Sequence, residues 1–480
     1  MKTPSPFLSL LGCLAALVFL PSVCAQTPAE PATAIQPASV APTLTPSPQC
    51  PLAGWSEGLV YHVGPTAQFP VSDTANNPQT DCAFHQWAWE AFVWATAINT
   101  NGGQPRFLSL ATLESLSKPT AKEGPNPLAL KPRTLKPAGA PPAKGDKQAG
   151  GGLVVDQNGQ IVWYSVHMND VYAKVVQQYA GMTNYNKAAA TATFPVGSAV
   201  FKAAWQVVPD GTPPTGIYWQ KTTIPLLVNN PKGGIMIDPS GKTRPVTVAL
   251  VGLHVVGVTD NHPEFLWATF EHLQNAPDLA DPNGYNSPAS VSNKSFTFYA
   301  ANTPANACNP DPSTTTLKVT DRVKQTVSAT PMTNVFRQYA TGGENAEGTQ
   351  EIVNTTIQAQ GALAQMPQYP KEAVWANYKL IGTTWIQPNT LKPDVAQLEK
   401  QAVGSVNLAN ATLETYFQGP EHNFNKNPMA NCFMCHNTGG SAGNPSYPGK
   451  DINLSHQLLA TLKPSPTPSK RSSLPPKTGN

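Results

Sequence analysis

The chain has 480 residues, enough for one large domain or two with a core of ordinary size. Only 12% of the residues are charged and 50 are prolines, a composition that suits a loop-rich exported protein better than a helical cytosolic enzyme. The formal net charge of +3 comes largely from two segments: residues 116–150 hold seven lysines and arginines against two acidic residues, and residues 463–480 hold four against none. The remainder is acidic, which argues against nucleic-acid binding.

The beginning of the chain predicts a secretory signal peptide over residues 1–25. Lys2 precedes an apolar run from Phe7 to Leu20, and small residues follow at the usual cleavage spacing near Ala25. A lipoprotein signal at Cys13 is the weaker alternative, because it would cut the apolar run in its middle. No later segment has the roughly 18–20 unbroken apolar residues of a membrane span. We therefore expect a periplasmic or secreted bacterial protein.

The composition divides the rest of the chain. Residues 26–50, mostly Pro, Ala and Thr, are expected to form a flexible leader, and residues 463–480 a disordered tail. Between them we expect an α+β body over 51–410 and a mostly irregular or helical segment over 411–462. Residues 116–150 lack an apolar period, which predicts a long surface loop or disordered insert.

The first strong helix signal is an aromatic stripe formed by Phe84, Trp87, Ala91 and Trp94, with Asp81 as a possible N-cap. Such a stripe could line a haem face, but it is more often plain core. Further helices are predicted over 170–179, 351–366 and 451–462. Strands are predicted over 160–166, 200–208, 217–228, 246–258, 264–273, 295–299 and 374–385, the first half of the last being a possible helix. Turn-forming residues 259–263 should join two of these strands as a hairpin. The pattern predicts an α+β fold with a β-rich core and a few helices.

The stretch Cys432-Phe433-Met434-Cys435-His436 carries the clearest chemical signal. Cys-x-x-Cys-His places two thiols one helical turn apart, where they can form thioether bonds to the vinyl groups of a haem, and sets an imidazole beside them to ligate the iron. We predict one covalently bound haem c held by Cys432 and Cys435, with His436 as the proximal iron ligand. Export supports this prediction, because bacteria attach haem covalently outside the cytoplasm.

Three other interpretations of these cysteines are a thioredoxin-like redox pair, half of a zinc site, and a disulfide. Zinc would need a second Cys/His pair at ligand spacing, and no other two cysteines lie close together. A thioredoxin-like pair would sit early in a strand–helix unit, not in an Asn-, Gly- and Pro-rich setting. Cys50, Cys82 and Cys308 remain, so one disulfide is plausible in an oxidising compartment. The pair Cys50–Cys82 is preferred, and the sequence leaves the other pairings open.

Several sequence segments, which occur in a fixed order, resemble those of a family of exported bacterial proteins. Its members are described as cytochrome c family or haem-binding proteins. The segments are Val251–Val256, Phe265–His272, Tyr378–Trp385, Asn410–Tyr416 and the haem motif, and the resemblance spans roughly Trp87 to Leu459 without the Pro-rich insert. Members carry one Cys-x-x-Cys-His near the C-terminus and have no settled activity. The resemblance implies haem and export without naming a reaction.

The chain departs from small cytochromes c, in which the motif opens a domain and a downstream methionine supplies the sixth ligand. Here no methionine follows Met434. The preceding body must therefore build the haem pocket, or the haem stays partly exposed.

The sixth iron ligand has several candidates. His254 shares a strand face with Leu250, Gly252 and Val256, so it should point into an apolar layer, where an inward His is more often a core residue than a ligand. The other candidates are His272, expected to form an ion pair with Glu271 on the sheet surface, His456, expected to be exposed on a helix, Met168, and Met429. An open or water-ligated iron is equally compatible with the sequence.

The state of that position separates the functions. A filled position indicates electron transfer, and an open one indicates a haem enzyme or a sensor of a small ligand such as peroxide or a gas. A third interpretation is a binding or scaffold protein with a structural haem. The sequence has no His-Glu-x-x-His motif. We favour electron transfer, with a basic redox partner protein docking on the acidic body.

Overall fold

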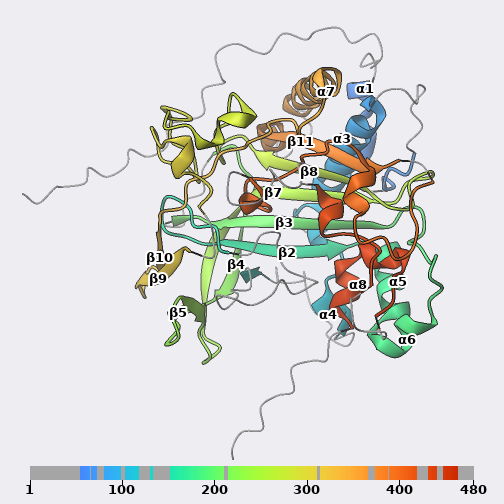
Figure 1. Cartoon of the computed structure of the whole chain (residues 1–480), viewed down its shortest axis with the longest axis horizontal. Coiled ribbons are helices and arrows are strands. Elements are labelled where there is room, and N and C mark those ends of the chain that lie inside the picture. The colour runs from blue at the N-terminus through green and yellow to red at the C-terminus, as the bar shows by residue number, and fades with distance from the viewer. Residues whose placement is uncertain are drawn as a thin grey trace, which may run out of the picture. The chain divides into compact units, whose positions relative to one another are not determined.

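The computed structural model describes residues 55–64, 66–72, 81–98, 103–117, 130–132, 152–209, 215–310, 314–365, 373–387, 389–418, 431–440 and 447–462 (Figure 1). The expected signal peptide, leader and tail lie outside these residues, as does most of 116–150.

The helices are short apart from two. The α-helices are α1 (Trp55–Gly58), α2 (Val60–Val63), α3 (Cys82–Thr96), α4 (Leu113–Ser117), α5 (Asp170–Tyr179), α6 (Gly181–Lys187), α7 (Ala346–Ala364) and α8 (His456–Ala460). The 3-10 helices are η1 (Arg106–Ser109), η3 (Pro282–Asn286), η4 (Ala305–Ala307), η5 (Ala373–Asn377), η6 (Leu398–Gln401), η7 (Thr415–Phe417), η8 (Cys432–Met434) and η9 (Asp451–Leu454).

The strands build one large antiparallel sheet and two small ones. They are β1 (Lys131–Pro132), β2 (Val162–Met168), β3 (Ala199–Val207), β4 (Trp219–Pro225), β5 (Leu227–Asn229), β6 (Ile235–Ile237), β7 (Thr243–Gly257), β8 (Leu266–His272), β9 (Thr316–Asp321), β10 (Thr326–Thr330), β11 (Tyr378–Ile386) and β12 (Ala402–Gly404). The large sheet has the order β1-β2-β3-β7-β8-β11-β12, and β4 pairs with the first half of β7. The predicted α+β class with a β-rich core is confirmed.

The predicted hairpin is the centre of the large sheet. β7 and β8 pair antiparallel, with His254 opposite Thr269 and Val256 opposite Trp267. On its other edge β7 pairs with β3, which places Lys202 opposite His254. Side chains directly opposite one another share a sheet face. Lys202, His254 and Thr269 therefore lie side by side on one face of the sheet.

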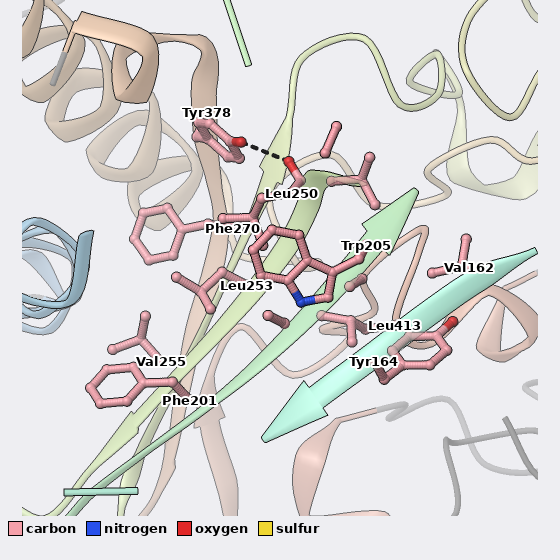
Figure 2. Packing of buried hydrophobic residues seen from close by; sticks show 14 of the residues in the cluster. Val162, Tyr164, Phe201, Trp205, Leu250, Leu253, Val255, Phe270, Tyr378 and Leu413 are labelled. Carbon is pink, nitrogen blue, oxygen red and sulfur yellow. Dashed lines mark hydrogen bonds between the residues drawn. The ribbon is translucent and has the colours of Figure 1, made fainter. Parts of the chain in front are cut away.

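One side of the sheet is covered by α3, whose residues belong to the largest hydrophobic core cluster. Trp87, Trp89 and Phe92 are fully buried, and the Phe92 ring stacks on Phe270 of β8 with centroids 4.2 Å apart. Figure 2 shows part of this core, where the Tyr378 hydroxyl donates to the Leu250 carbonyl at 2.6 Å. The expectation of an aromatic core helix is confirmed. Asp81 precedes the helix, but its side chain makes no cap hydrogen bond.

A second hydrophobic cluster joins the C-terminal segment to one end of the sheet. It contains Val256 and Trp267 from the sheet, Phe433 from the cysteine motif, and Leu454 and Leu458 from the residues around α8. α5, which begins and ends where the sequence predicts, contributes Tyr172 and Val176 to this cluster. The cysteine motif is therefore packed against the body and not presented on a separate arm.

Several sequence predictions need correction. Residues 295–299 form only an isolated bridge between Phe296 and Tyr299, because the surrounding residues make turns. The predicted strand 217–228 divides into β4 and β5, and the predicted strand 374–385 begins as the 3-10 helix η5. The predicted helix 451–462 divides into η9 and α8 at Ser455, whose side chain caps α8. Within the expected insert, Lys131–Pro132 forms an edge strand paired with β2.

The structure settles part of the disulfide pairing of the cysteines outside the motif. Cys82 is disulfide-bonded, and Cys308 is a buried free thiol. Since the thiols of Cys432 and Cys435 are also free, the partner of Cys82 lies outside the described residues, where Cys50 also falls. Pairings that involve Cys308 are excluded.

Candidate functional site

The cysteine motif folds into a single helical turn. The Asn431 side chain accepts the backbone N–H of Phe433 at 3.0 Å and so starts the turn. The N–H groups of Cys435 and His436 both donate to the Cys432 carbonyl, at 3.2 and 2.9 Å. Residues three apart on such a turn lie on one side of it. The local fold therefore presents both thiols together, as the spacing predicts.

Phe433 anchors this turn to the body. Its side chain is fully buried, and its ring meets Trp267 of β8 edge to face with centroids 5.9 Å apart. Burial of a phenylalanine ring stabilises by about 2–3 kcal/mol. The neighbouring Cys432 is half-buried and Cys435 is exposed. The apolar residue of the motif thus holds the turn in place, while Cys435 stays at the surface.

The hydrogen bonding of His436 identifies its tautomer. Nδ1 lies 2.7 Å from the carbonyl oxygen of Leu454. A carbonyl can only accept, so Nδ1 carries the proton and the lone pair is on Nε2. Nε2 has no hydrogen-bond partner among the residues that the structure describes. Burial, and then the charge of His456, lower the pKa of His436 well below its usual value. A neutral imidazole with a free Nε2 is the form that ligates a metal.

Two aromatic rings fix the plane of His436. The ring of His456 stacks on it with centroids 3.7 Å apart and planes 21° from parallel, and the Trp267 ring lies 4.3 Å away at 46°. Nε2 of His456 also lies 3.1 Å from the Cys435 carbonyl. His456 is therefore half-buried against the motif, not exposed as the sequence predicts. The prediction was wrong because α8 packs back onto the motif, where the His456 ring stacks on that of His436.

Glu414, Lys202 and His254 lie beside one another and act on the motif electrostatically. Glu414 pairs with His254 at 2.8 Å, and Lys202 lies beside His254 in the sheet. Burial alone would raise the pKa of Glu414, but the charges of His254 and Lys202 outweigh it and lower that pKa, so the carboxylate is ionised.

The Glu414 carboxylate acts electrostatically on both thiols. Cys435 is exposed as a residue, but the packing around the motif desolvates both sulfur atoms. This desolvation, and then the negative charge of Glu414, raise the pKa of Cys432 and raise that of Cys435 to about 11. Both thiols are therefore protonated at neutral pH. A thioredoxin-like nucleophile needs the opposite shift.

The segment that leads to the motif is tied to β8 by hydrogen bonds. The Asn410 side chain donates to Thr269 Oγ1 at 2.8 Å and to the Phe270 carbonyl at 3.1 Å, and the Ala411 N–H donates to Glu271 at 2.7 Å. The segment lies so close to β7 that a Cβ at Gly252 would collide with Thr412 Oγ1. This close approach requires glycine at position 252 and sets Glu414 against His254.

His254 does not point into an apolar layer, which corrects that prediction. Its Nδ1 lies 2.8 Å from Thr269 Oγ1 and its Nε2 2.8 Å from Glu414 Oε1. The side chain is 15% exposed. The hydroxyl of Thr269 and the carboxylate of Glu414 belong to segments distant in sequence from His254. The alternation of side chains along one strand cannot predict such partners. As an iron ligand, His254 would have to give up one of these two hydrogen bonds.

The other candidates for a sixth ligand are placed as follows. Met168 is fully buried in the same cluster as Phe433, whereas Met429 lies outside the described residues. His272 is buried, and its Nε2 lies 3.2 Å from the Gly216 carbonyl. The predicted ion pair of His272 with Glu271 is wrong, since adjacent strand residues point to opposite faces. Glu271 instead accepts from the fully buried Arg337 at 2.9 Å.

Sequence reasoning missed the residues that orient the motif. Leu454 contributes only its backbone carbonyl, for which no sequence signal exists. Trp267 and Glu414 lie in segments that the family resemblance singles out, but their roles depend on contacts across the fold. Period-two alternation on β8 does place Trp267 and Thr269 on one face.

One motif needs separate comment. Residues Gly439-Gly440-Ser441-Ala442-Gly443 match Gly-x-Ser-x-Gly, the spacing of a hydrolase nucleophile elbow. Ser441 lies outside the described residues. An elbow follows directly on a strand, whereas the described residues 431–440 before it contain η8 and no strand. The structural context therefore does not favour a hydrolase.

Metal-binding clusters and membrane-spanning helices were also sought in the described part of the chain. It contains no cluster of three or more His, Cys, Asp or Glu side chains arranged to hold a metal ion. A haem iron needs only one or two protein ligands, so this finding bears on a zinc site and not on haem. No described helix has the length and apolar character of a membrane span.

Comparisons with models of protein families, with curated proteins and with solved structures found no match.

Proposed function

We propose that this protein is a c-type cytochrome that carries one covalently attached haem and transfers electrons outside the cytoplasm. Cys432 and Cys435 would form the thioether bonds, and His436 would ligate the iron through Nε2. The observation that carries the proposal is the hydrogen bond from His436 Nδ1 to the Leu454 carbonyl at 2.7 Å. It selects the tautomer that a haem ligand needs and makes the imidazole a better electron donor.

The residues around His436 fit this role. A haem bound here would supply one-electron redox chemistry. His456 and Trp267 would keep the ligating ring in one plane, and Phe433 would keep the motif on the body. The charges of Glu414 and Lys202 would tune the reduction potential, because a nearby negative charge favours ferric iron and a positive charge favours ferrous iron. The exposure of Cys435 supports electron transfer, because it puts one edge of the site at the surface.

A second candidate is a haem enzyme or ligand sensor with an open sixth position. It is favoured by one observation, that both ring nitrogens of His254 are already hydrogen-bonded. The two candidates make different spectroscopic predictions. A low-spin ferric spectrum with narrow reduced bands supports electron transfer and contradicts the open site. A high-spin spectrum that shifts with cyanide or carbon monoxide supports the open site.

The haem itself is tested by covalent attachment. The full chain, produced in a host that matures c-type cytochromes, should keep haem on a denaturing gel and give the spectrum of a doubly linked haem in pyridine. Cys432→Ser and Cys435→Ser should each abolish the double linkage. The matched control is Cys308→Ser, which changes a free thiol outside the motif and should keep the haem. Unchanged covalent haem in the two motif variants would falsify the proposal.

A further inference from the structure

A groove of about 580 Å³ lies at the end of the large sheet where β7 begins. Its walls come from the loop before β2, the end of β3, β4, the start of β7, and the β9–β10 hairpin. Pockets that take small molecules usually have volumes of this order. The groove is remote from the cysteine motif, since Arg244 in its wall lies ten residues before His254 on β7, or roughly 33 Å along the strand.

All the charged side chains that line the groove are cationic. Lys221, Arg244 and Lys324 line it, and no acidic residue does. None of the three forms a salt bridge in the part of the chain that the structure describes. Asp321 acts electrostatically on Lys324 from outside the lining, which leaves Lys221 and Arg244 as the cations without a paired carboxylate. Cations gathered in this way create a positive potential that favours an anion.

Two hydrogen bonds fix the orientation of the Arg244 guanidinium in the groove. Its Nη1 donates to the Lys324 carbonyl at 3.1 Å, and its Nη2 donates to Gln160 Oε1 at 3.0 Å. Each terminal nitrogen keeps a second N–H for another acceptor. A guanidinium fixed in this way loses little side-chain entropy when it binds a carboxylate or phosphate.

The nearby carboxylates of Asp156 and Asp321 accept backbone hydrogen bonds in the walls of the groove. Asp156 accepts the N–H groups of Asn158 and Gln160 at 2.9 and 2.7 Å, and Asp321 accepts those of Val323 and Lys324 at 2.7 and 2.9 Å. These hydrogen bonds shape two neighbouring loops of the groove wall, which are joined where the Val327 N–H donates to the Gly159 carbonyl at 2.8 Å. The rest of the lining includes apolar side chains, among them Val207, Pro245 and Val246.

We propose that this groove binds a small organic anion, with a carboxylate or phosphate head group against Arg244, Lys221 and Lys324 and a short apolar body against Pro245 and Val246. The inference does not rest on the proposed haem, because the groove shares no residue with that site.

Calorimetric titration of the full chain tests the proposal with four probes: inorganic phosphate, hexyl phosphate, hexanoate and hexanol. Hexyl phosphate and hexanoate should bind, with added salt weakening both, and hexanol should not, because it has the apolar body without the charge. Whichever anion binds more tightly identifies the head group. Inorganic phosphate should bind more weakly than hexyl phosphate, since it makes only the polar contacts.

Arg244→Gln should weaken binding of the preferred anion roughly ten-fold or more, as expected for loss of a charged hydrogen bond. Lys221→Gln, at an exposed position without a hydrogen bond of its own, provides a second variant if Arg244→Gln fails to fold, and it should weaken binding several-fold. Lys318→Gln removes the same charge from the exposed side of β9 outside the groove and should bind like the parent. Equal affinity for hexanol, equal loss in the Lys318 variant, or no binding of any anion would each overturn the proposal.

Discussion

The imidazole rings of His436 and His456 lie nearly parallel, with their centroids 3.7 Å apart. The carbonyl of Leu454, two residues before His456, holds Nδ1 of the same His436 ring. One short segment thus fixes both the tautomer and the plane of the predicted iron ligand.

Removal of the stacked ring should loosen the motif. We expect His456→Ala to lower the free energy of unfolding by about 1 kcal/mol, since it removes an aromatic contact and a hydrogen bond to the Cys435 carbonyl. His456→Phe keeps the stack and should lose less. Urea unfolding measures both variants. Gln457→Ala, on the next residue of α8, serves as the control and should leave the stability near that of the parent.

Phe433 should be the costliest residue of the motif to truncate. Phe433→Ala removes a fully buried ring from the second hydrophobic cluster and should lower the free energy of unfolding by about 3–5 kcal/mol. It should also reduce the yield of covalent haem, because the thiols lose their fixed position. Met434→Ala, at a half-buried neighbouring residue, should cost much less. Equal effects of the two substitutions on urea unfolding would contradict the anchoring role.

Glu414 should set the reduction potential of a bound haem. Glu414→Gln keeps an oxygen that can accept from His254 but removes a negative charge near the motif. Ferric iron then loses stabilisation relative to ferrous iron, so the midpoint potential should rise by on the order of tens of millivolts. Redox titration followed by absorbance measures it. Glu57→Gln, at an exposed residue of α1, should leave the potential unchanged, and a fall in potential in the Glu414 variant would refute the assignment.

A buried carboxyl cluster should make stability depend on pH. Burial and the charge of Asp81 raise the pKa of Glu344 to about 8 from an ordinary 4.5, and burial and Asp81 also raise the pKa of Glu351 to about 7. As pH rises from 4.5 towards 8, the unfolded chain releases protons that the folded chain retains. Stability should therefore fall over this range.

The substitution Glu344→Gln tests this dependence. Glutamine stays neutral in both states, so its urea midpoint should decline less than that of the parent between about pH 5 and about pH 8.5. The Gln side chain can still accept from Ser405, which donates to Glu344 at 2.9 Å. Glu57→Gln, outside the cluster, should keep the full decline. A parent protein whose midpoint rises with pH over this range would show that the carboxyl cluster does not control it.

The central strands and the longer helices were predictable because their signals are local, whereas α6 and the β9–β10 hairpin were not predicted. The apolar period of α5 and its N-cap Asn169 place that helix within the chain without any tertiary contact. The residues 259–263 mark the turn between β7 and β8 for the same reason. The prediction failed at 295–299, where β-prone residues find no partner strand and make turns.

Side-chain partners were not predictable in this way. Alternation correctly puts His254 on the sheet face of Gly252 and Val256, but it cannot show that Glu414 crosses that face and pairs with it. Similarly, the helical pattern at 451–462 indicates a helix, but it does not show that His456 would stack on a histidine twenty residues earlier.

By itself the sequence determined the contiguous chemistry of this protein: two thiols and an imidazole within five residues, whose spacing is a property of the chain. The tertiary structure alone decided which nitrogen of His436 is free, what holds its ring, and which charges act on the thiols. Those features depend on a backbone carbonyl, a folded-back helix and the register of β3, β7 and β8. Each of these features requires contact between segments that are distant in sequence. Local sequence signals therefore cannot determine them.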